Sequence, residues 1–166
     1  MELTNLFFQT FALKEAQRFK MKVGVFLFLI NNNQILLLRR AKTGIDDGLY
    51  VVPMGCVDGN ETLTAACARE AYEEANIIIN PEDMRVCHVM HRLHHMPQGH
   101  SFEQMDIFFY TSTFSGKVNN NEPHKCDELA FYPLDNLPIN TVPFIRAAIN
   151  GYRSSRFFSE FGWDKL

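Results

Sequence analysis

The sequence predicts one mixed α/β domain. Segments with strand and helix patterns alternate along the chain, and neither an internal repeat nor a low-complexity linker separates them. The 166 residues lie within the usual size range of a single domain. Hydrophobic residues make up 46% of the chain and include 15 phenylalanines, which is typical of a protein with a packed core.

The first predicted element is a helix over residues 3–19. Its apolar residues fall near one face, and charged residues such as Lys14 and Arg18 fall on the other. The phenylalanines suit packing onto the domain or onto a second copy of it, so a homodimer is one expected outcome. The polar face lacks the basic enrichment of helices that lie on membranes, which disfavours that role.

Strand patterns dominate the next part of the chain. An apolar strand at 22–30 is followed by an asparagine-rich turn and a hairpin partner at 34–39, and a short strand is expected at 48–53. Residues 62–75 form the strongest helix pattern, because they are rich in Ala and Glu and contain no Gly or Pro.

The remaining elements continue the mixture. Strands are predicted at 85–93, 103–114 and 129–133. A closing helix is predicted at 142–153, with Pro143 near its first turn, where proline is favoured.

Charge and composition exclude several classes of protein. The formal net charge of −3 and the lack of a basic stripe disfavour a nucleic-acid partner, RNA caps included. The most apolar run, residues 23–30, is too short to span a bilayer, and the N-terminus lacks the features of a signal peptide. The four cysteines form no C-x-x-C pair, so we expect free thiols and a cytoplasmic location.

The helix at 62–75 places three glutamates on one face, namely Glu70, Glu73 and Glu74. Like charges at this spacing repel and destabilise a helix, and a solvated acidic face is the simplest explanation of such a cluster. The loop before the helix, residues 53–60, contains Gly55 and is suited to a close backbone approach. Carboxylates and backbone carbonyls are together the ligands that Mg²⁺ takes, which favours a metal site.

Residues 55–77 resemble the Nudix box, G-x5-E-x7-R-E-U-x-E-E-x-G-U, in which U is aliphatic. The matching positions are Gly55, Glu61, Arg69, Glu70, Glu73, Glu74 and Ile77, with Ala71 at the first U. Asn76 stands where the family has Gly, and we expect it to adopt the left-handed conformation that Asn tolerates after a helix. The similarity to MutT-like members extends over most of residues 22–149.

The resemblance implies a Nudix-type α/β/α sandwich around a mixed β-sheet. We expect an N-terminal helical extension at 1–20, the Nudix hydrolase domain at 21–155 and a C-terminal tail at 156–166. The tail and the first helix lie outside what the family pattern explains.

The resemblance also implies roles for the residues of the box. The Gly55 carbonyl, Glu70 and Glu74 would bind Mg²⁺, with Mn²⁺ as a substitute, and Glu73 would be either a further ligand or the base for the attacking water. Arg69 would hold Glu70 in place, and Glu61 would support the loop or an outer metal.

Further candidates lie outside the box. By its resemblance to MutT-like enzymes, which supply a fourth carboxylate from a late loop, the chain would use Glu122 as a further metal ligand. Glu128 competes for this role, and a plain surface glutamate is the alternative for Glu122. Arg39 and Arg40 end a strand, so alternation directs them to opposite faces and at most one of them reaches a substrate phosphate.

Five histidines crowd residues 88–100, beside Cys87. They lack the helical spacing of a zinc hydrolase and any accompanying carboxylate motif. We therefore interpret them as strand-end and loop histidines near the mouth of a pocket, within reach of a base or ribose.

The sequence thus favours an enzyme that hydrolyses a phosphoanhydride bond in a nucleoside diphosphate derivative. The expected reaction converts a nucleoside or deoxynucleoside triphosphate into a monophosphate and pyrophosphate. The alternative is a binding module of the same fold that senses a nucleotide without turnover. Such a module would be expected to have lost a carboxylate of the box, whereas Glu70, Glu73 and Glu74 are all present.

Overall fold

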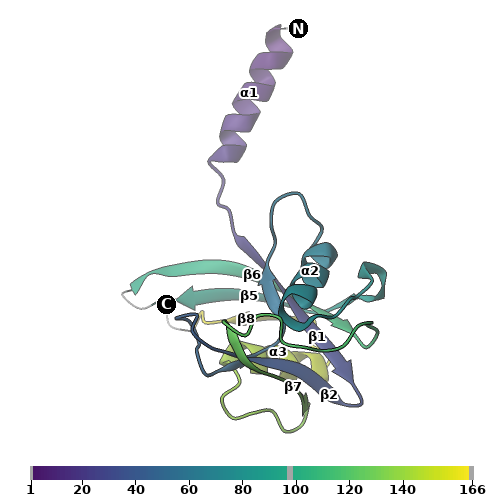
Figure 1. The fold of residues 1–166 in the computed structure, drawn as a ribbon. Coiled ribbons are helices and arrows are strands. Elements are labelled where there is room, and N and C mark those ends of the chain that lie inside the picture. The colour runs from purple at the N-terminus through teal and green to yellow at the C-terminus, as the bar shows by residue number, and fades with distance from the viewer. Residues whose placement is uncertain (1, 97–98, 165–166) are drawn as a thin grey trace.

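The computed structural model describes residues 2–96 and 99–164. Within them the chain forms one mixed sheet of eight strands, three α-helices and a short 3-10 helix, which confirms the predicted α/β class (Figure 1). The elements in chain order are α1 (Glu2–Ala16), β1 (Lys22–Asn31), β2 (Gln34–Arg40), β3 (Tyr50–Val51), β4 (Met54–Cys56), α2 (Leu63–Ala75), η1 (Pro81–Asp83), β5 (Arg85–His95), β6 (Ser101–Thr111), β7 (Cys126–Pro133), α3 (Pro143–Arg153) and β8 (Phe158–Phe161).

The strands are ordered β3-β2-β1-β6-β5-β8, with β4 also paired to β1 and β7 to β2. The β1–β6 and β5–β8 pairs are parallel, and the other pairs are antiparallel. One edge of β1 is occupied by β6 along most of its length. The other edge pairs with β4 near its start and with β2 near its end, so β2 and β4 diverge from each other.

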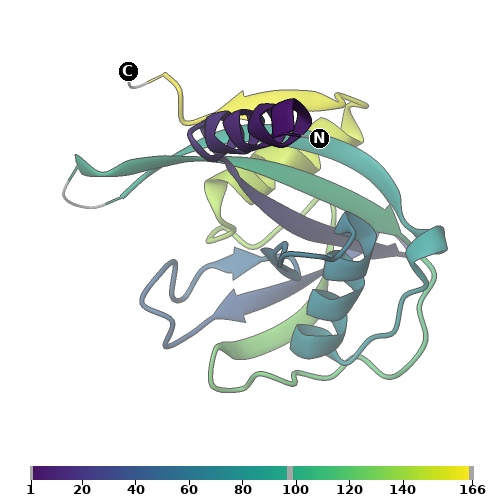
Figure 2. The ribbon, with the colours of Figure 1, turned by 90° about the horizontal axis from the view of Figure 1, so that it is seen from above.

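Helices cover both faces of this sheet (Figure 2). On one face, Phe26 and Phe28 of β1 pack in a core cluster with Ile145 of α3. On the other face, Val25 and Leu27 pack in a second cluster with residues of α2. Burial on both sides explains why β1 is almost continuously apolar and does not alternate with polar residues.

Both ends of α2 are capped by its own sequence. The Thr62 side chain accepts a hydrogen bond from the Ala65 N–H at 3.2 Å, which satisfies one of the free donors of the first turn. Asn76 ends the helix at φ 57° and ψ 32°, which confirms the predicted left-handed conformation. Its side-chain amide also donates to the Lys117 carbonyl at 3.2 Å, an interaction that glycine could not make.

Two strands lie where none was predicted. The segment after Pro53, expected to be a loop, contains β4, and residues 158–161 form β8 at the sheet edge beside β5. Both strands are short and have no clear alternation of their own. They exist because distant partners, β1 and β5, offer free backbone donors and acceptors, which no local pattern reveals.

The first helix stands away from the sheet, at the end of an extended connection (Figure 1). Its Phe11 and Leu13 side chains are exposed, so the predicted packing of this helix onto the domain is not observed. Among the described residues, no helix is long and apolar enough to cross a membrane.

Candidate active site

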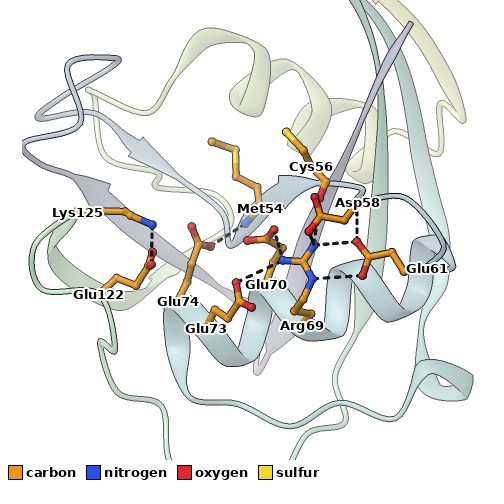
Figure 3. A network of polar contacts seen from close by, with 10 residues as sticks. All are labelled: Met54, Cys56, Asp58, Glu61, Arg69, Glu70, Glu73, Glu74, Glu122 and Lys125. Atoms are coloured by element: carbon orange, nitrogen blue, oxygen red, sulfur yellow. Dashed lines mark hydrogen bonds and ion pairs between the residues drawn. The ribbon is translucent and has the colours of Figure 1, made fainter. Parts of the chain in front are cut away.

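The glutamates of α2 are positioned by a helix that packs closely on the sheet. Its small residues Ala66, Ala71 and Ala75 are fully buried, and α2 contacts β1 and β4. Because alanine adds little bulk, the helix lies close to the sheet, and the longer side chains project toward β4 (Figure 3). The helical spacing that was read from the sequence therefore gathers the acidic side chains in one place.

Arg69 is the centre of the polar network in Figure 3. Its guanidinium contacts the carboxylate of Glu61 at 2.9 Å, that of Glu70 at 2.7 Å and that of Glu73 at 3.3 Å, and donates to the Cys56 carbonyl at 3.1 Å. A planar guanidinium has five donors, which suits it to hold several carboxylates at once. The hydrogen bond from Arg69 also lowers the pKa of Glu61.

Gly55 and Glu70 approach each other too closely for any side chain at position 55. A Cβ atom built on Gly55 would overlap the carboxyl group of Glu70. Burial raises the pKa of Glu70, against the opposing effect of the Arg69 hydrogen bond. The box glycine therefore makes room for a half-buried carboxylate beside the backbone of β4.

Glu74 is the most enclosed carboxylate of the cluster, although part of its surface faces a cavity. The Met54 N–H donates to it at 2.9 Å. Burial raises its pKa to about 8, helped by the negative charges of Glu70 and Glu122. A carboxylate in this position is costly to ionise unless positive charge is supplied nearby.

A cavity of about 270 Å³ opens between α2, the end of β2 and β4. Its lining includes Glu70, Glu73, Glu74 and Glu122, together with Arg40 and Lys125. Glu122 reaches it from the loop before β7, where Lys125 Nζ contacts its carboxylate at 2.6 Å. The structure thus brings four predicted acidic residues and one predicted basic residue to a single cavity.

Arg39 and Glu128 lie together outside this cavity. Arg39 contacts Asp127 at 2.7 Å and Glu128 at 3.2 Å, and its guanidinium lies over the Tyr50 ring. Glu128 also accepts a hydrogen bond from the Tyr132 hydroxyl. Arg40, by contrast, is held at the first cavity by the following loop, donating to Thr43 Oγ1 at 3.1 Å and to the Ile45 carbonyl at 2.8 Å.

The acidic residues fit a hard divalent cation by their chemistry. No three His, Cys, Asp or Glu side chains of residues 2–96 and 99–164 converge as the ligands of one metal ion. Glu70 turns to Arg69, Glu122 to Lys125 and Glu74 to the Met54 N–H. Yet these like charges share one cavity, and the raised pKa of Glu74 reports a burial cost that a bound cation would offset.

The histidines of β5 do not form a metal site. Buried His88 contacts the Arg156 carbonyl at 2.7 Å and Ser159 Oγ at 2.8 Å, which links β5 to the chain around β8. His91 contacts Glu103 at 3.1 Å, and its carbonyl accepts a hydrogen bond from Trp163 Nε1. His94 and His95 line a second cavity, between the end of β5, β8 and the start of α3.

Sequence reasoning missed Lys125 and Thr43 as cavity residues. Lys125 follows Glu122 by three residues, a spacing that could have indicated an ion pair. Thr43 carried no comparable signal, because the loop that positions it has no regular periodicity.

Comparisons with known proteins agree with this geometry. Residues 20–150 match the NUDIX domain family. A MutT NUDIX hydrolase from Burkholderia pseudomallei is similar in structure, with a TM-score of 0.70 and 25% identity over 80% of this chain and 98% of that chain. A MutT protein from Bacillus halodurans shows the same fold, with a TM-score of 0.68 and 17% identity over 84% of this chain and 88% of that one.

A third similar structure, of the same fold, is a bifunctional NMN adenylyltransferase/ADP ribose pyrophosphatase from Francisella tularensis, complexed with AMP and a manganese ion. It has a TM-score of 0.59 and 17% identity, over 92% of this chain and 47% of that chain.

Proposed function

The chain belongs to the NUDIX family, and from this premise we propose that it hydrolyses a nucleoside or deoxynucleoside triphosphate to the monophosphate and pyrophosphate. The observation that carries the proposal is the single cavity lined by Glu70, Glu73, Glu74 and Glu122 together with two cationic side chains. The four acidic side chains outnumber the two cationic ones and would repel a polyphosphate, so a bound cation is needed to hold one there.

We propose that the Gly55 carbonyl, Glu70, Glu74 and Glu122 hold Mg²⁺ or Mn²⁺. When bound, the cation neutralises phosphate charge and lowers the pKa of a water molecule. Arg69 is a positioning residue, because it contacts Glu61, Glu70 and Glu73 but does not line the cavity. Arg40, and not Arg39, is the proposed phosphate ligand, with Lys125 beside it.

The proposed reaction adds water across the anhydride bond between the α- and β-phosphates. The water oxygen forms a new P–O bond to one of these two phosphorus atoms, and the P–O bond from that phosphorus to the bridging oxygen breaks. The products are the nucleoside monophosphate and pyrophosphate. Glu73 is the proposed acceptor of the water proton. It lines the cavity, half of its side chain is exposed, and among the described side chains its hydrogen-bond and ion-pair partner is Arg69 at 3.3 Å.

The test is turnover of a panel of nucleotides with Mg²⁺ or with excess chelator, with identification of both products. Glu70→Gln and Glu74→Gln keep the size of each side chain and remove its charge. We expect each variant to lose on the order of 100-fold in turnover or more. In chelator, Glu74→Gln should melt no lower than the parent, because the buried neutral amide removes a like-charge contact.

Glu82→Gln is the matched control, because Glu82 is an exposed glutamate of η1. It should leave turnover and melting temperature unchanged. Parental turnover in both site variants, or full turnover in chelator, contradicts the proposal. Nucleotide binding without turnover by the parent would instead support the alternative of a sensing module.

A further inference from the structure

The strands β2 and β7 meet through a bulge beside the cavity of about 270 Å³ between α2, β2 and β4, the carboxylate cavity. Their regular antiparallel ladder ends with Arg39 opposite Glu128, and the next pair is Arg40 with Cys126. Asp127 is therefore an extra residue on β7. Bulges of this kind re-aim side chains, and they are common next to active sites.

The extra residue changes what β7 presents to the carboxylate cavity. A regular ladder would place Asp127 opposite Arg40, and every residue before it would move to the other face of the strand. With the bulge, Cys126 takes that place, and both Arg40 and Cys126 line the cavity. The position of the bulge therefore decides which side chains of this segment reach the cavity.

The turn that carries Glu122 is built directly onto the bulge. The N–H groups of Lys125 and Cys126 donate to the Glu122 carbonyl at 2.8 and 2.9 Å. From the β2 side, the Ala41 N–H donates to the Lys125 carbonyl at 2.8 Å. The Asn120 side chain closes the turn, donating to the Cys126 carbonyl at 2.7 Å and accepting from the Glu122 N–H at 3.0 Å. A displacement of the bulge would therefore move Glu122 and Lys125 together.

Arg39 holds the two side chains that the bulge brings together. A bulge sets two residues opposite one, here Asp127 and Glu128 opposite Arg39. The Arg39 Nε donates to Asp127 Oδ1 at 2.7 Å, and Nη1 lies 3.2 Å from Glu128 Oε2. The hydrogen bond from Arg39 lowers the pKa of Asp127. Two neighbouring carboxylates repel each other, and the planar guanidinium opposite them binds both at once.

The surroundings of Arg39 lie apart from the carboxylate cavity. Glu128 accepts a hydrogen bond from the Tyr132 hydroxyl, and the hydroxyls of Tyr132 and Tyr50 lie 3.1 Å apart. Arg39, Tyr50 and Tyr132 line a separate cavity of about 560 Å³. Arg39 therefore acts on the carboxylate cavity through the backbone of the bulge and not by contact.

An ordinary surface ion pair explains this arrangement incompletely. The side chains of Arg39 and Asp127 are 34% and 48% exposed, and pairs at such exposure contribute little to stability. This pair, however, joins β2 to the extra residue of β7, 88 residues away along the chain. Without it, the bulge is free to slip by one residue, a change that exchanges the faces of the strand at the cavity.

We propose that Arg39 is a positioning residue, which pairs with Asp127 and Glu128 and so fixes the bulge that presents Arg40 and Glu122 to the carboxylate cavity. Arg40 is the proposed phosphate ligand and Glu122 a proposed metal ligand, so this inference rests on the proposed function. Loss of Arg39 weakens the binding of both the nucleotide and the cation, although Arg39 contacts neither.

The first test is Arg39→Met, which keeps the length of the side chain and removes its charge and donors. We expect the KM for the best nucleotide of the panel to rise about tenfold or more, and the Kd for Mn²⁺, measured by calorimetry without nucleotide, to rise by a similar factor. The melting temperature in chelator should stay within about 2 °C of the parent, unlike the result of a merely structural role.

Arg18→Met is the matched control, because it breaks an exposed arginine–carboxylate pair of 2.6 Å with Glu15. It should keep the parental KM, Mn²⁺ Kd and melting temperature. Parental KM and Kd values in Arg39→Met overturn the inference, and so does a lowered melting temperature with parental Mn²⁺ binding.

Two double variants show whether Arg39 acts through the bulge. Asp127→Asn, added to Arg39→Met, removes the repulsion between the two carboxylates and should recover most of the lost Mn²⁺ affinity. A residue that touched the substrate would not be rescued in this way. In a Glu122→Gln background, Arg39→Met should weaken Mn²⁺ binding no further, because both changes act on the same ligand. Additive losses, or the absence of rescue, overturn the inference.

Arg39→Lys replaces Arg39→Met if the latter does not fold. Lysine keeps the charge but offers a single point of contact, so an intermediate rise in the Mn²⁺ Kd is expected, and a parental value overturns the inference. The two proposals can fail separately. Mn²⁺ binding that depends on Arg39 and Glu122, in a parent that hydrolyses no nucleotide of the panel, contradicts the proposed function alone. Hydrolysis with parental KM and Kd values in Arg39→Met contradicts this inference alone.

Discussion

Gly55 shows how a single residue can control the carboxylate cluster without contributing a side chain. A Cβ at this position would overlap the carboxyl group of Glu70, which Arg69 holds at 2.7 Å. The obstacle is the flexible end of a side chain, so the fold can yield by moving Glu70. The position is therefore more sensitive for the site than for the fold.

Gly55→Ala should separate these two effects. We expect turnover with Mg²⁺ to fall by about 10- to 100-fold, because Glu70 is displaced, while the free energy of unfolding in chelator changes by less than about 1 kcal/mol. Gly59→Ala, in the same loop, is the control, since nothing lies within 4 Å of a Cβ there. Equal activities of the two variants, measured with melting curves, would refute this account of Gly55.

Asn76 illustrates a residue whose conformation could be read from the sequence. It follows the last turn of α2, where a left-handed residue ends a helix, and the observed φ of 57° agrees. The prediction succeeded because helix termination depends on local backbone geometry. Its hydrogen bond to the Lys117 carbonyl could not be foreseen, since 41 residues separate the two along the chain.

At the scale of elements, β8 is joined to the sheet by His88 as well as by its backbone. The ring of His88 contacts the Arg156 carbonyl and Ser159 Oγ, and Gly151 of α3 packs so closely that a Cβ would lie 2.7 Å from the ring. Burial lowers the pKa of His88, against the opposing effect of its hydrogen bond to the Arg156 carbonyl, and the positive charge of Arg156 lowers it further. The folded chain therefore favours the neutral ring.

Stability should consequently depend on pH through this residue. In the unfolded chain His88 titrates near its ordinary pKa of 6.5, so below that pH the unfolded state binds a proton that the folded state resists. The contribution is complete above pH 6.5 and is lost as the pH falls. We expect the melting temperature in chelator to decline between pH 7.5 and 5.5 more steeply for the parent than for His88→Asn.

The comparison isolates one group among several that titrate in this range. Asn at position 88 can still donate to the Arg156 carbonyl but cannot be protonated. His100→Asn serves as the control, because His100 is exposed and should show the parental slope. Parallel curves for the parent and His88→Asn would show that His88 does not couple β8 to pH.

At the scale of the whole molecule, the two ends of the chain differ in their attachment (Figure 1). Residues 20–150 match the family, and we propose that 1–20 form an extension of a domain that begins at residue 21. The C-terminal end, in contrast, is integrated: β8 pairs with β5, His95 contacts the Gly162 carbonyl at 2.7 Å, and Phe161 lines the second cavity.

Truncation should therefore have opposite results at the two ends. Deleting residues 1–19 should leave turnover and melting temperature at parental values. Deleting residues 157–166 should lower the melting temperature by roughly 5 °C or more. An unsatisfied buried polar group such as His88 costs about 1–3 kcal/mol, each worth about 2–4 °C at this size, before the loss of strand pairing.

The measurements are the melting temperature by calorimetry and the turnover of both deletion variants. Size-exclusion chromatography of the parent and the N-terminal deletion tests whether α1 holds two copies of the chain together. A destabilised N-terminal deletion, or a C-terminal deletion as stable as the parent, would contradict the proposed attachment of the ends.

The sequence by itself determined α2, its C-terminal cap at Asn76 and the buried strands, because these depend on spacings within a few turns or residues. The glutamates of α2 share a face by helical periodicity, and β1 is apolar because both its faces are covered. Only the tertiary structure decided that Arg40 and Glu122 line the carboxylate cavity while Arg39 and Glu128 pair elsewhere.

The buried ion pair of Arg92 and Asp106, and the strands β4 and β8, likewise became visible only in three dimensions. The physical reason is strand register. A shift of one residue sends a side chain to the opposite face of a sheet, and β2 has such an irregularity between Arg39 and Arg40. Register is set by contacts between distant segments. The local sequence pattern therefore predicts the candidate residues, and tertiary packing determines which of them reach the site.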